Sequence, residues 1–116
     1  MPDTAAAFDL FLMLAMAHFL GDFGLQSDRM AREKCPGRGE TLGWGWWLTS
    51  HAAIHGLLVA LITQQPILGL GEWIIHIMID FGKCRHLWRL PFDQSLHLAT
   101  KVVWALLAVS LATAPG

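Results

Sequence analysis

The chain has 116 residues, of which 54% are hydrophobic and only 15% are charged, and its formal net charge is −1. This length suits one domain, and the low share of charged residues is unusual for soluble proteins, in which about a quarter of the residues are charged. The nearly neutral balance gives no reason to expect a nucleic-acid partner. The composition therefore predicts a single membrane-embedded domain over residues 1–116.

Four apolar stretches predict four membrane-spanning helices in an all-α, antiparallel bundle. A spanning helix needs ~20 residues, and three of the stretches come close to this length. The third is short and contains Glu72, so either the bilayer thins there or the helix begins at Pro66. Lys101 lies in the fourth stretch and is expected to pair with an acidic group or to extend to the membrane surface. The expected spans are residues 5–23, 48–64, 67–81 and 93–112.

The first connector is long and polar, and its first part, up to about Lys34, is expected to form a short helix at the membrane surface. Its last part, residues 43–47, is rich in Trp, which anchors helices at the headgroup level. The chain has two cysteines, Cys35 and Cys84. Two cysteines do not make a disulfide framework, so we expect free thiols on the reducing side of the membrane.

Basic residues predict the orientation. Seven of the eight Lys and Arg residues lie in the first and third connectors, whereas the second connector and both ends of the chain carry none. Lys and Arg collect in cytoplasmic loops, so we expect these two connectors in the cytoplasm and both termini on the other side. Four of the cations are interpreted first as such orienting charges and, alternatively, as ligands of lipid phosphate: Arg29, Arg32, Lys34 and Lys83.

Four pairs of His and Asp residues lie in the expected spans, each with a spacing of four. On a helix this spacing places both side chains on one face, one turn apart. Each pair lies at the end of its span that adjoins a basic connector, so with a rise of 1.5 Å per residue all eight groups fall within about 10 Å of one boundary. The pairs are His18/Asp22, His51/His55, His76/Asp80 and Asp93/His97.

Five imidazoles and three carboxylates at one depth predict a metal site with all eight as ligands. Such pairs can also join helices by hydrogen bonds, but buried ion pairs often add little net stability. His and Asp suit Zn, Fe or Mn, and two ions ~3.5–4 Å apart can activate water and hold a phosphoester. Asp22, Asp80 and Asp93 are the candidate catalytic groups, as bridging ligands or as the base. Residues expected to contact substrate or to support the ligands are Gln26, Lys83 and Gln94.

The two halves of the chain share a motif. His18-x-x-x-Asp22-Phe23 and His76-x-x-x-Asp80-Phe81 are each followed by a Lys-Cys dipeptide. The match indicates a possible internal duplication of a two-helix hairpin, with parallel repeats.

The same residues carry a resemblance to a known family. The motifs are His18-x-x-x-Asp22-Phe23 with Leu25-Gln26, His51 and His55, His76-x-x-Ile79-Asp80 with Lys83, and Asp93-Gln94-x-x-His97. Together they resemble a family of small bacterial integral-membrane proteins of unknown function, DUF3307, from about residue 15 to about residue 106. The resemblance implies a bacterial inner-membrane protein and carries no activity with it. The His-x-x-x-His element is also similar, more weakly, to inner-membrane metal-dependent hydrolases.

Three functions follow as alternatives. The first is a metal-dependent hydrolase that acts on a lipid or lipid-linked phosphoester at the cytoplasmic leaflet. The second is a non-enzymatic subunit of a larger membrane complex, or of a homo-oligomer, that uses the pairs to bind a structural metal, haem or pigment. The third is a proton or metal-ion conduit, against which the outer half of the spans offers few polar groups.

Overall fold

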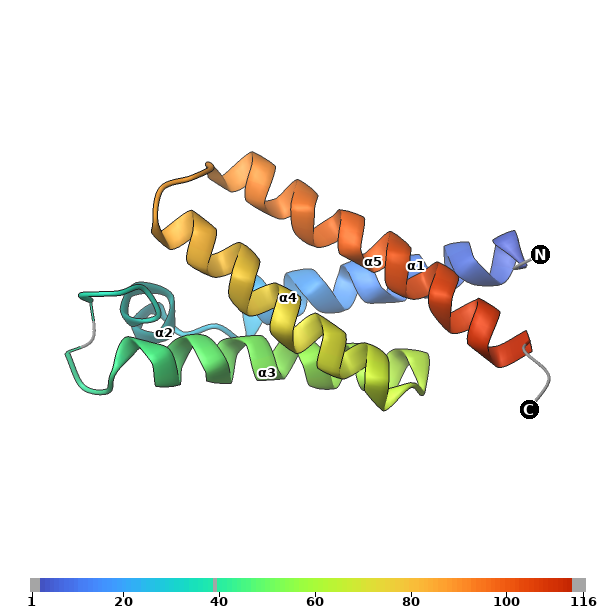
Figure 1. The fold of residues 1–116 in the computed structure, drawn as a ribbon, viewed down its shortest axis with the longest axis horizontal. Helices are drawn as coiled ribbons and strands as arrows, with labels where there is room; N and C mark the ends of the chain where they lie inside the picture. Colours follow the sequence, from blue (N-terminus) through green and yellow to red (C-terminus); the bar gives the residue numbers. More distant parts are fainter. Residues whose placement is uncertain (1–2, 39, 114–116) are drawn as a thin grey trace.

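The computed structural model describes residues 3–38 and 40–113, which are helical apart from short connections. Four long helices run lengthwise, the short α2 lies at one end, and both ends of the chain lie at the other (Figure 1). Helix α1 continues directly into a π-helix, η1. The elements are α1 (Thr4–Phe19), η1 (Leu20–Gly24), α2 (Asp28–Glu33), α3 (Trp44–Thr63), α4 (Pro66–Cys84) and α5 (Leu90–Thr113).

Three helical segments are long and apolar enough to cross a membrane: Thr4–Gly24, Trp44–Thr63 and Leu90–Ala112. Helix α4 is not among them, because its 19 residues include Glu72, Asp80 and Lys83. The chain is thus all-helical in its described part and has the features of a membrane-associated protein, whereas a fourth span stays a prediction.

Several helix boundaries differ from the expected spans for local reasons. Helix α3 begins at Trp44 rather than at residue 48, so the Trp-rich stretch forms its first turn. Helix α4 begins with Pro66, whose fixed φ suits the first helical position, and continues to Cys84. At 1.5 Å per residue α4 is ~28 Å long, so this helix is longer than the third stretch expected from the sequence. The short helix expected before residue 34 is α2, capped by the Ser27 hydroxyl.

The four long helices pack in a closed ring, in which α1 and α4 each contact both α3 and α5. Two glycines allow α3 and α4 to approach closely. A Cβ atom added to Gly56 would lie 2.8 Å from the carbonyl oxygen of Gly69, and one added to Gly69 would lie 2.6 Å from that of Gly56. Any larger residue would separate these two helices.

The interior is as polar as it is apolar, and the outside is strongly apolar. Among the described residues, 12 polar or charged residues are buried against 11 hydrophobic ones, while many large apolar side chains face outward. A soluble protein buries most of its large apolar side chains, so a polar interior with an apolar outside fits a lipid environment. The apolar core occupies the half of the ring toward the termini and consists of Leu14, Val59, Leu68, Trp104, Ala105 and Ala108.

The prediction of two free thiols is wrong, because Cys35 and Cys84 form a disulfide with their Cα atoms 5.3 Å apart. The two cysteines are 49 residues apart in sequence, so no local pattern marks them as partners. The fold brings the segment after α2 against the end of α4. An ion pair of 3.0 Å between Lys34 and Asp80 joins the same two segments.

The shared motif of the two halves lies in different local structures. After His18 the chain forms the π-helix η1, whereas after His76 a regular α-helix continues to Cys84. The internal duplication therefore stays a prediction.

Candidate metal centre

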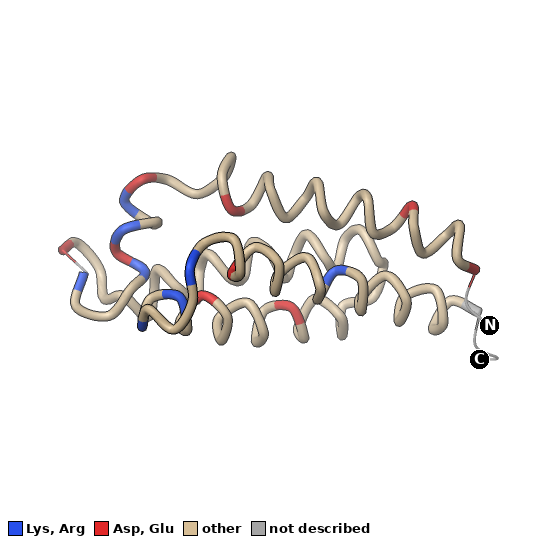
Figure 2. The backbone as a smooth tube through the Cα atoms, turned by 90° about the horizontal axis from the view of Figure 1, so that it is seen from above, with Lys and Arg blue, Asp and Glu red and all other residues tan. Residues whose placement is uncertain are grey.

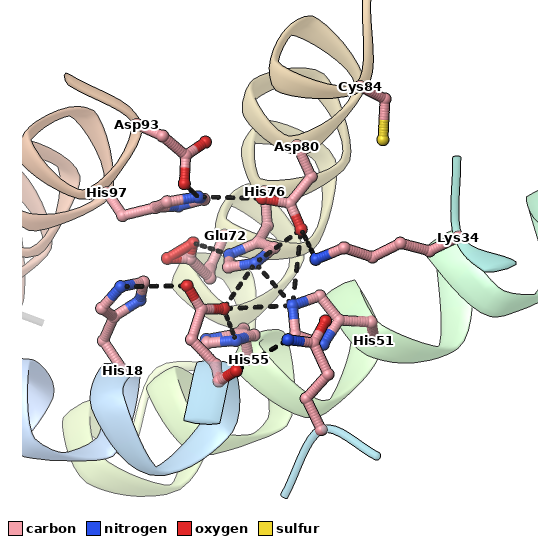
Figure 3. Close-up of polar contacts among 12 residues, drawn as sticks. His18, Lys34, His51, His55, Glu72, His76, Asp80, Cys84, Asp93 and His97 are labelled. Carbon is pink, nitrogen blue, oxygen red and sulfur yellow. Dashed lines mark hydrogen bonds and ion pairs between the residues drawn. The ribbon is translucent and has the colours of Figure 1, made fainter. Parts of the chain in front are cut away.

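All eight residues of the four pairs are buried and form one cluster between α1, η1, α3, α4 and α5. Figure 3 labels all of them except Asp22. None of the eight side chains is more than 8% exposed. The cluster lies on the connector side of the apolar core, near the end of the molecule where most Lys and Arg residues gather (Figure 2). Each pair contributes two side chains from one helical face, so four separate segments build the cluster.

Asp22 is the centre of the first group of possible ligands. Its Oδ1 atom lies 3.1 Å from Nε2 of His51, 2.9 Å from Nε2 of His55 and 3.6 Å from Nε2 of His76. Asp22 lies in the π-helix η1, an element that often occurs at functional sites. One carboxylate oxygen therefore faces imidazoles from two other helices.

Asp80 is the centre of the second group. Its Oδ1 atom lies 3.0 Å from Nε2 of His97, and its Oδ2 atom lies 3.4 Å from Nε2 of both His51 and His76. Lys34 reaches in from the α2 side and donates to the same Oδ2 atom at 3.0 Å (Figure 3). The Asp80 carboxylate thus joins three imidazoles and one ammonium.

The remaining two predicted ligands lie at the side of the cluster formed by α1 and α5. Asp93 Oδ2 is 3.6 Å from Nε2 of His97, and Asp93 Oδ1 accepts a hydrogen bond from Trp88 Nε1 at 3.4 Å. His18 Nε2 lies 3.4 Å from Asp22 Oδ2. Both residues therefore extend the cluster rather than form its middle.

The described atoms form three overlapping groups that could hold metal ions, with the possible ligand atoms of each group within 4.8 Å of one another. Seven of the eight predicted ligands occur in them, and His18 is the exception. The groups are Asp22/His51/His55/His76, His76/Asp80/His97 and Asp22/Asp93/His97.

The nitrogen and oxygen atoms of the cluster could accept a bound cation. His51 Nε2 and His76 Nε2 face each other at 3.3 Å, and at most one of two facing nitrogens can donate its proton to the other. His55 Nε2 is close to Asp22 but has no hydrogen-bond partner among the described atoms. Three carboxylates gathered in a buried site need cationic partners, and a divalent cation between them would supply such a partner. The donor set therefore fits Zn, Fe or Mn.

The rings leave one another little freedom to move. His55 stacks on His76 with ring centroids 3.8 Å apart, and His76 lies 4.2 Å from His97. Gly21 makes room for this arrangement, because a Cβ atom there would lie 2.6 Å from Cε1 of His55. The possible ligands are thus held in place by packing.

The three supporting residues predicted from the sequence lie in different places. Gln94 contacts the cluster directly: it accepts from His18 Nε2 at 2.8 Å and donates to Asp22 Oδ2 at 2.8 Å. Gln26 donates to the backbone carbonyl of Asp22 at 2.7 Å, and no hydrogen bond joins it to a cluster side chain among the described residues. Lys83 lies outside the cluster, in the wall of an adjoining pocket.

Two contributors to the cluster escaped the sequence analysis as site residues. Lys34 is expected from the sequence as an orienting charge or as a ligand of lipid phosphate, and nothing in the sequence connects it with Asp80, 46 positions away. Glu72 extends the spacing of four by one more turn before His76, a signal that was available. Its Oε2 atom lies 3.7 Å from Nδ1 of His76, the position from which carboxylates commonly orient metal-binding histidines.

Glu72 is in turn paired with Lys101, whose ammonium donates to its Oε1 atom. The Lys101 ammonium also donates to the His97 carbonyl at 3.3 Å. Of the two alternatives expected for Lys101, pairing with an acidic group is therefore confirmed, rather than extension to the membrane surface. The pair lies beneath the cluster, on the side of the apolar core.

Glu33, at the end of α2, orders the connector above the cluster. Its Oε1 atom accepts from the backbone N–H groups of Thr41 at 2.9 Å and Glu40 at 2.8 Å. These hydrogen bonds, first of all the one from Thr41, together with the charge of Arg29, lower the pKa of Glu33 to about 2. The segment that follows Lys34 is thereby folded back onto the end of α2.

Comparison with known proteins places this site in a family. Residues 10–114 match the family described as "Protein of unknown function (DUF3307)". The chain belongs to this family. No curated protein matches it, and no solved structure matches it. All eight cluster residues fall within the matched range.

Proposed function

We propose that the cluster binds divalent metal, as two ions of Zn, Fe or Mn, and that the protein is a metal-dependent hydrolase. The observation that carries the proposal is the arrangement of seven possible ligands in three overlapping groups, each within 4.8 Å. Adjacent groups share ligands, which suits two neighbouring ions rather than one. Bound ions would act as Lewis acids and would lower the pKa of a bound water.

The contacts of the carboxylates suggest different roles. Asp22 presents one oxygen to the imidazoles of α3 and α4 and the other to Gln94 and His18, which suits a bridging ligand. Asp80 belongs to the cluster and also lines a pocket that opens to the outside, so it is the carboxylate best placed to meet substrate or the attacking water. Asp93, at the side of the cluster, is the candidate for a further ligand or base.

The proposed substrate is a lipid or lipid-linked phosphoester. The cluster adjoins the basic end of the molecule, and the outer surface of the helices is apolar. A substrate with a lipid tail and an anionic headgroup matches both features. The proposed setting is the bacterial inner membrane, with α4 as the fourth span.

Two observations bear on which leaflet the cluster faces, and they point in opposite directions. Seven cations in the connectors favour the cytoplasmic side, whereas disulfides persist mainly in oxidising compartments. We propose the cytoplasmic leaflet, because charge sets the topology during insertion while a disulfide between Cys35 and Cys84 can form or be reduced afterwards.

The test is elemental analysis of protein purified in detergent from metal-replete cells, followed by hydrolysis assays. We expect about one or two ions per chain and loss of metal on His76→Ala or Asp80→Ala. His86→Ala is the matched control, since His86 is exposed and lies outside the cluster. The metal-bound protein should release phosphate or a headgroup from a lipid phosphoester, and a chelator should stop the release. Stably folded protein free of metal would overturn the proposal.

A second candidate is a non-enzymatic subunit that binds a structural metal, haem or pigment. The observation in its favour is the deep burial of the cluster, where His51, His76 and His97 have no exposed surface. Metal retained through purification without turnover of any lipid phosphoester would support a structural ion. A visible absorption band that is lost in His55→Ala would support haem or pigment.

A further inference from the structure

A pocket of about 520 Å³ opens beside the cluster, between the end of α2, the end of α4 and the connector to α5. Five of its lining residues are cationic, out of eight Lys and Arg residues in the chain. We call it the basic pocket. Its cations are Arg32, Lys34, Arg38, Lys83 and Arg89.

The charges of the basic pocket do not cancel within the protein. Asp80 is the only acidic residue among those that line it, and Asp80 already pairs with Lys34 at 3.0 Å. The side chains of Arg38, Lys83 and Arg89 make no hydrogen bond or ion pair with any described residue. Like charges gathered in one concavity repel, so the pocket is suited to an anion.

Ordinary orienting charge does not account for this gathering. The positive-inside rule requires cations on one side of the membrane but not in one pocket. Arg29 and Arg85 belong to the same two connectors and yet lie outside the pocket, and Arg29 instead faces Glu33 at 3.4 Å. The connectors therefore contain both kinds of cation, and only some of them converge.

The pocket is built before any ligand arrives. The ion pair of Lys34 with Asp80 joins its two walls at the inner end and does not depend on the redox state of the cysteines. In the oxidised protein the disulfide between Cys35 and Cys84 joins the same walls. A preformed site loses less conformational entropy when it binds a ligand. A volume of about 520 Å³ is within the range of small-molecule sites.

We propose that the basic pocket binds the phosphate of an anionic lipid headgroup and holds it next to Asp80. Three arginines suit this ligand, because the guanidinium group pairs with two phosphate oxygens at once. Trp88 and Leu90 add apolar surface to the same pocket, which suits a headgroup attached to a hydrocarbon chain. The inference rests on the proposed function in one respect only: the bound phosphate lies where the hydrolase would act.

The test measures binding to detergent-purified, full-length protein. The probes are phosphatidic acid in phosphatidylcholine vesicles, phosphatidylcholine alone, and inorganic pyrophosphate, each titrated before and after chelation of metal. The pocket variants Arg38→Gln and Arg89→Gln each remove one exposed arginine. Arg85→Gln is the matched control, because it removes an equally exposed arginine outside the pocket.

We expect tighter binding to vesicles that contain phosphatidic acid than to phosphatidylcholine alone. Each pocket variant should weaken that binding about tenfold, as loss of a charged hydrogen bond does, while Arg85→Gln changes it less than about twofold. Arg38→Lys, which keeps the charge, should retain most of the binding. Pyrophosphate competing as strongly as the lipid would assign the site to free phosphate instead.

Two further outcomes would overturn the inference. Equal losses in Arg85→Gln and the pocket variants would mean that diffuse surface charge attracts the vesicles. Binding lost on chelation or in His76→Ala, but unchanged in the arginine variants, would place the anion on the metal cluster and leave the hydrolase proposal standing. Conversely, binding by a metal-free protein that depends on Arg38 and Arg89 would support the pocket and count against the hydrolase.

Discussion

Gly21→Ala should lower metal affinity without removing a single ligand. The new Cβ atom would lie 2.6 Å from Cε1 and 2.7 Å from Nε2 of His55. An ordinary contact starts near 3.4 Å, so the ring must move by about 0.8 Å. It cannot move freely, because it stacks on His76 at 3.8 Å and is only 1% exposed.

A displacement of this size should reduce metal affinity by about 10–100-fold, the usual effect of losing the support of a ligand. The assay is competition with a chromogenic chelator, with thermal unfolding measured in parallel. Gly45→Ala is the matched control, because a Cβ atom there meets nothing within 4 Å. Wild-type metal affinity in Gly21→Ala, or an equal loss in both variants, would refute the assignment of His55 as a ligand.

Three further predictions concern the surroundings of the cluster. Lys101→Met leaves the Glu72 carboxylate buried without its partner, so the free energy of unfolding in denaturing detergent should fall by about 3–5 kcal/mol. The double variant Glu72→Leu/Lys101→Met should recover most of this loss, and no recovery would contradict the pairing. The pKa of Glu33 is lowered to about 2. Its carboxylate therefore stabilises the connector fully at any pH above the ordinary pKa of Glu, and this stabilisation is lost as the pH falls toward 2. Hydrogen-exchange protection of the connector should therefore fall over that range in the wild type and be low and nearly constant with pH in Glu33→Gln. If the cluster faces the cytoplasm, Cys35 and Cys84 should be reduced in growing cells, and a membrane-impermeant maleimide should not label them. A disulfide that persists in cells, and whose cysteines become labelled after external reduction, would place the cluster on the opposite side of the membrane.

The spacing of residues along the chain was sufficient for the local features. Apolar stretches of suitable length identify helices that can enter a membrane, because length and hydropathy alone set this requirement. A spacing of four fixes that His76 and Asp80 share one helical face, because a helix has 3.6 residues per turn. The helical class and the four pairs were therefore accessible from the sequence.

The sequence did not determine which faces meet, because helix rotation depends on packing between distant segments. Small residues decide the packing here: Gly56 and Gly69 bring α3 against α4, and Gly21 leaves space for the ring of His55. Lys34 reaches Asp80 only because the fold brings the segment after α2 against the end of α4, where Cys35 also meets Cys84.

The disulfide and the basic pocket belong to the tertiary structure for the same reason. Cys35 and Cys84 are 49 residues apart, and the pocket cations come from both connectors. Charge in the sequence predicted which end of the molecule is basic, since that property depends only on how many cations each connector carries. Only the folded chain decided that five of these cations converge beside Asp80, because the distance between residues of separate connectors is set by the helices that join them.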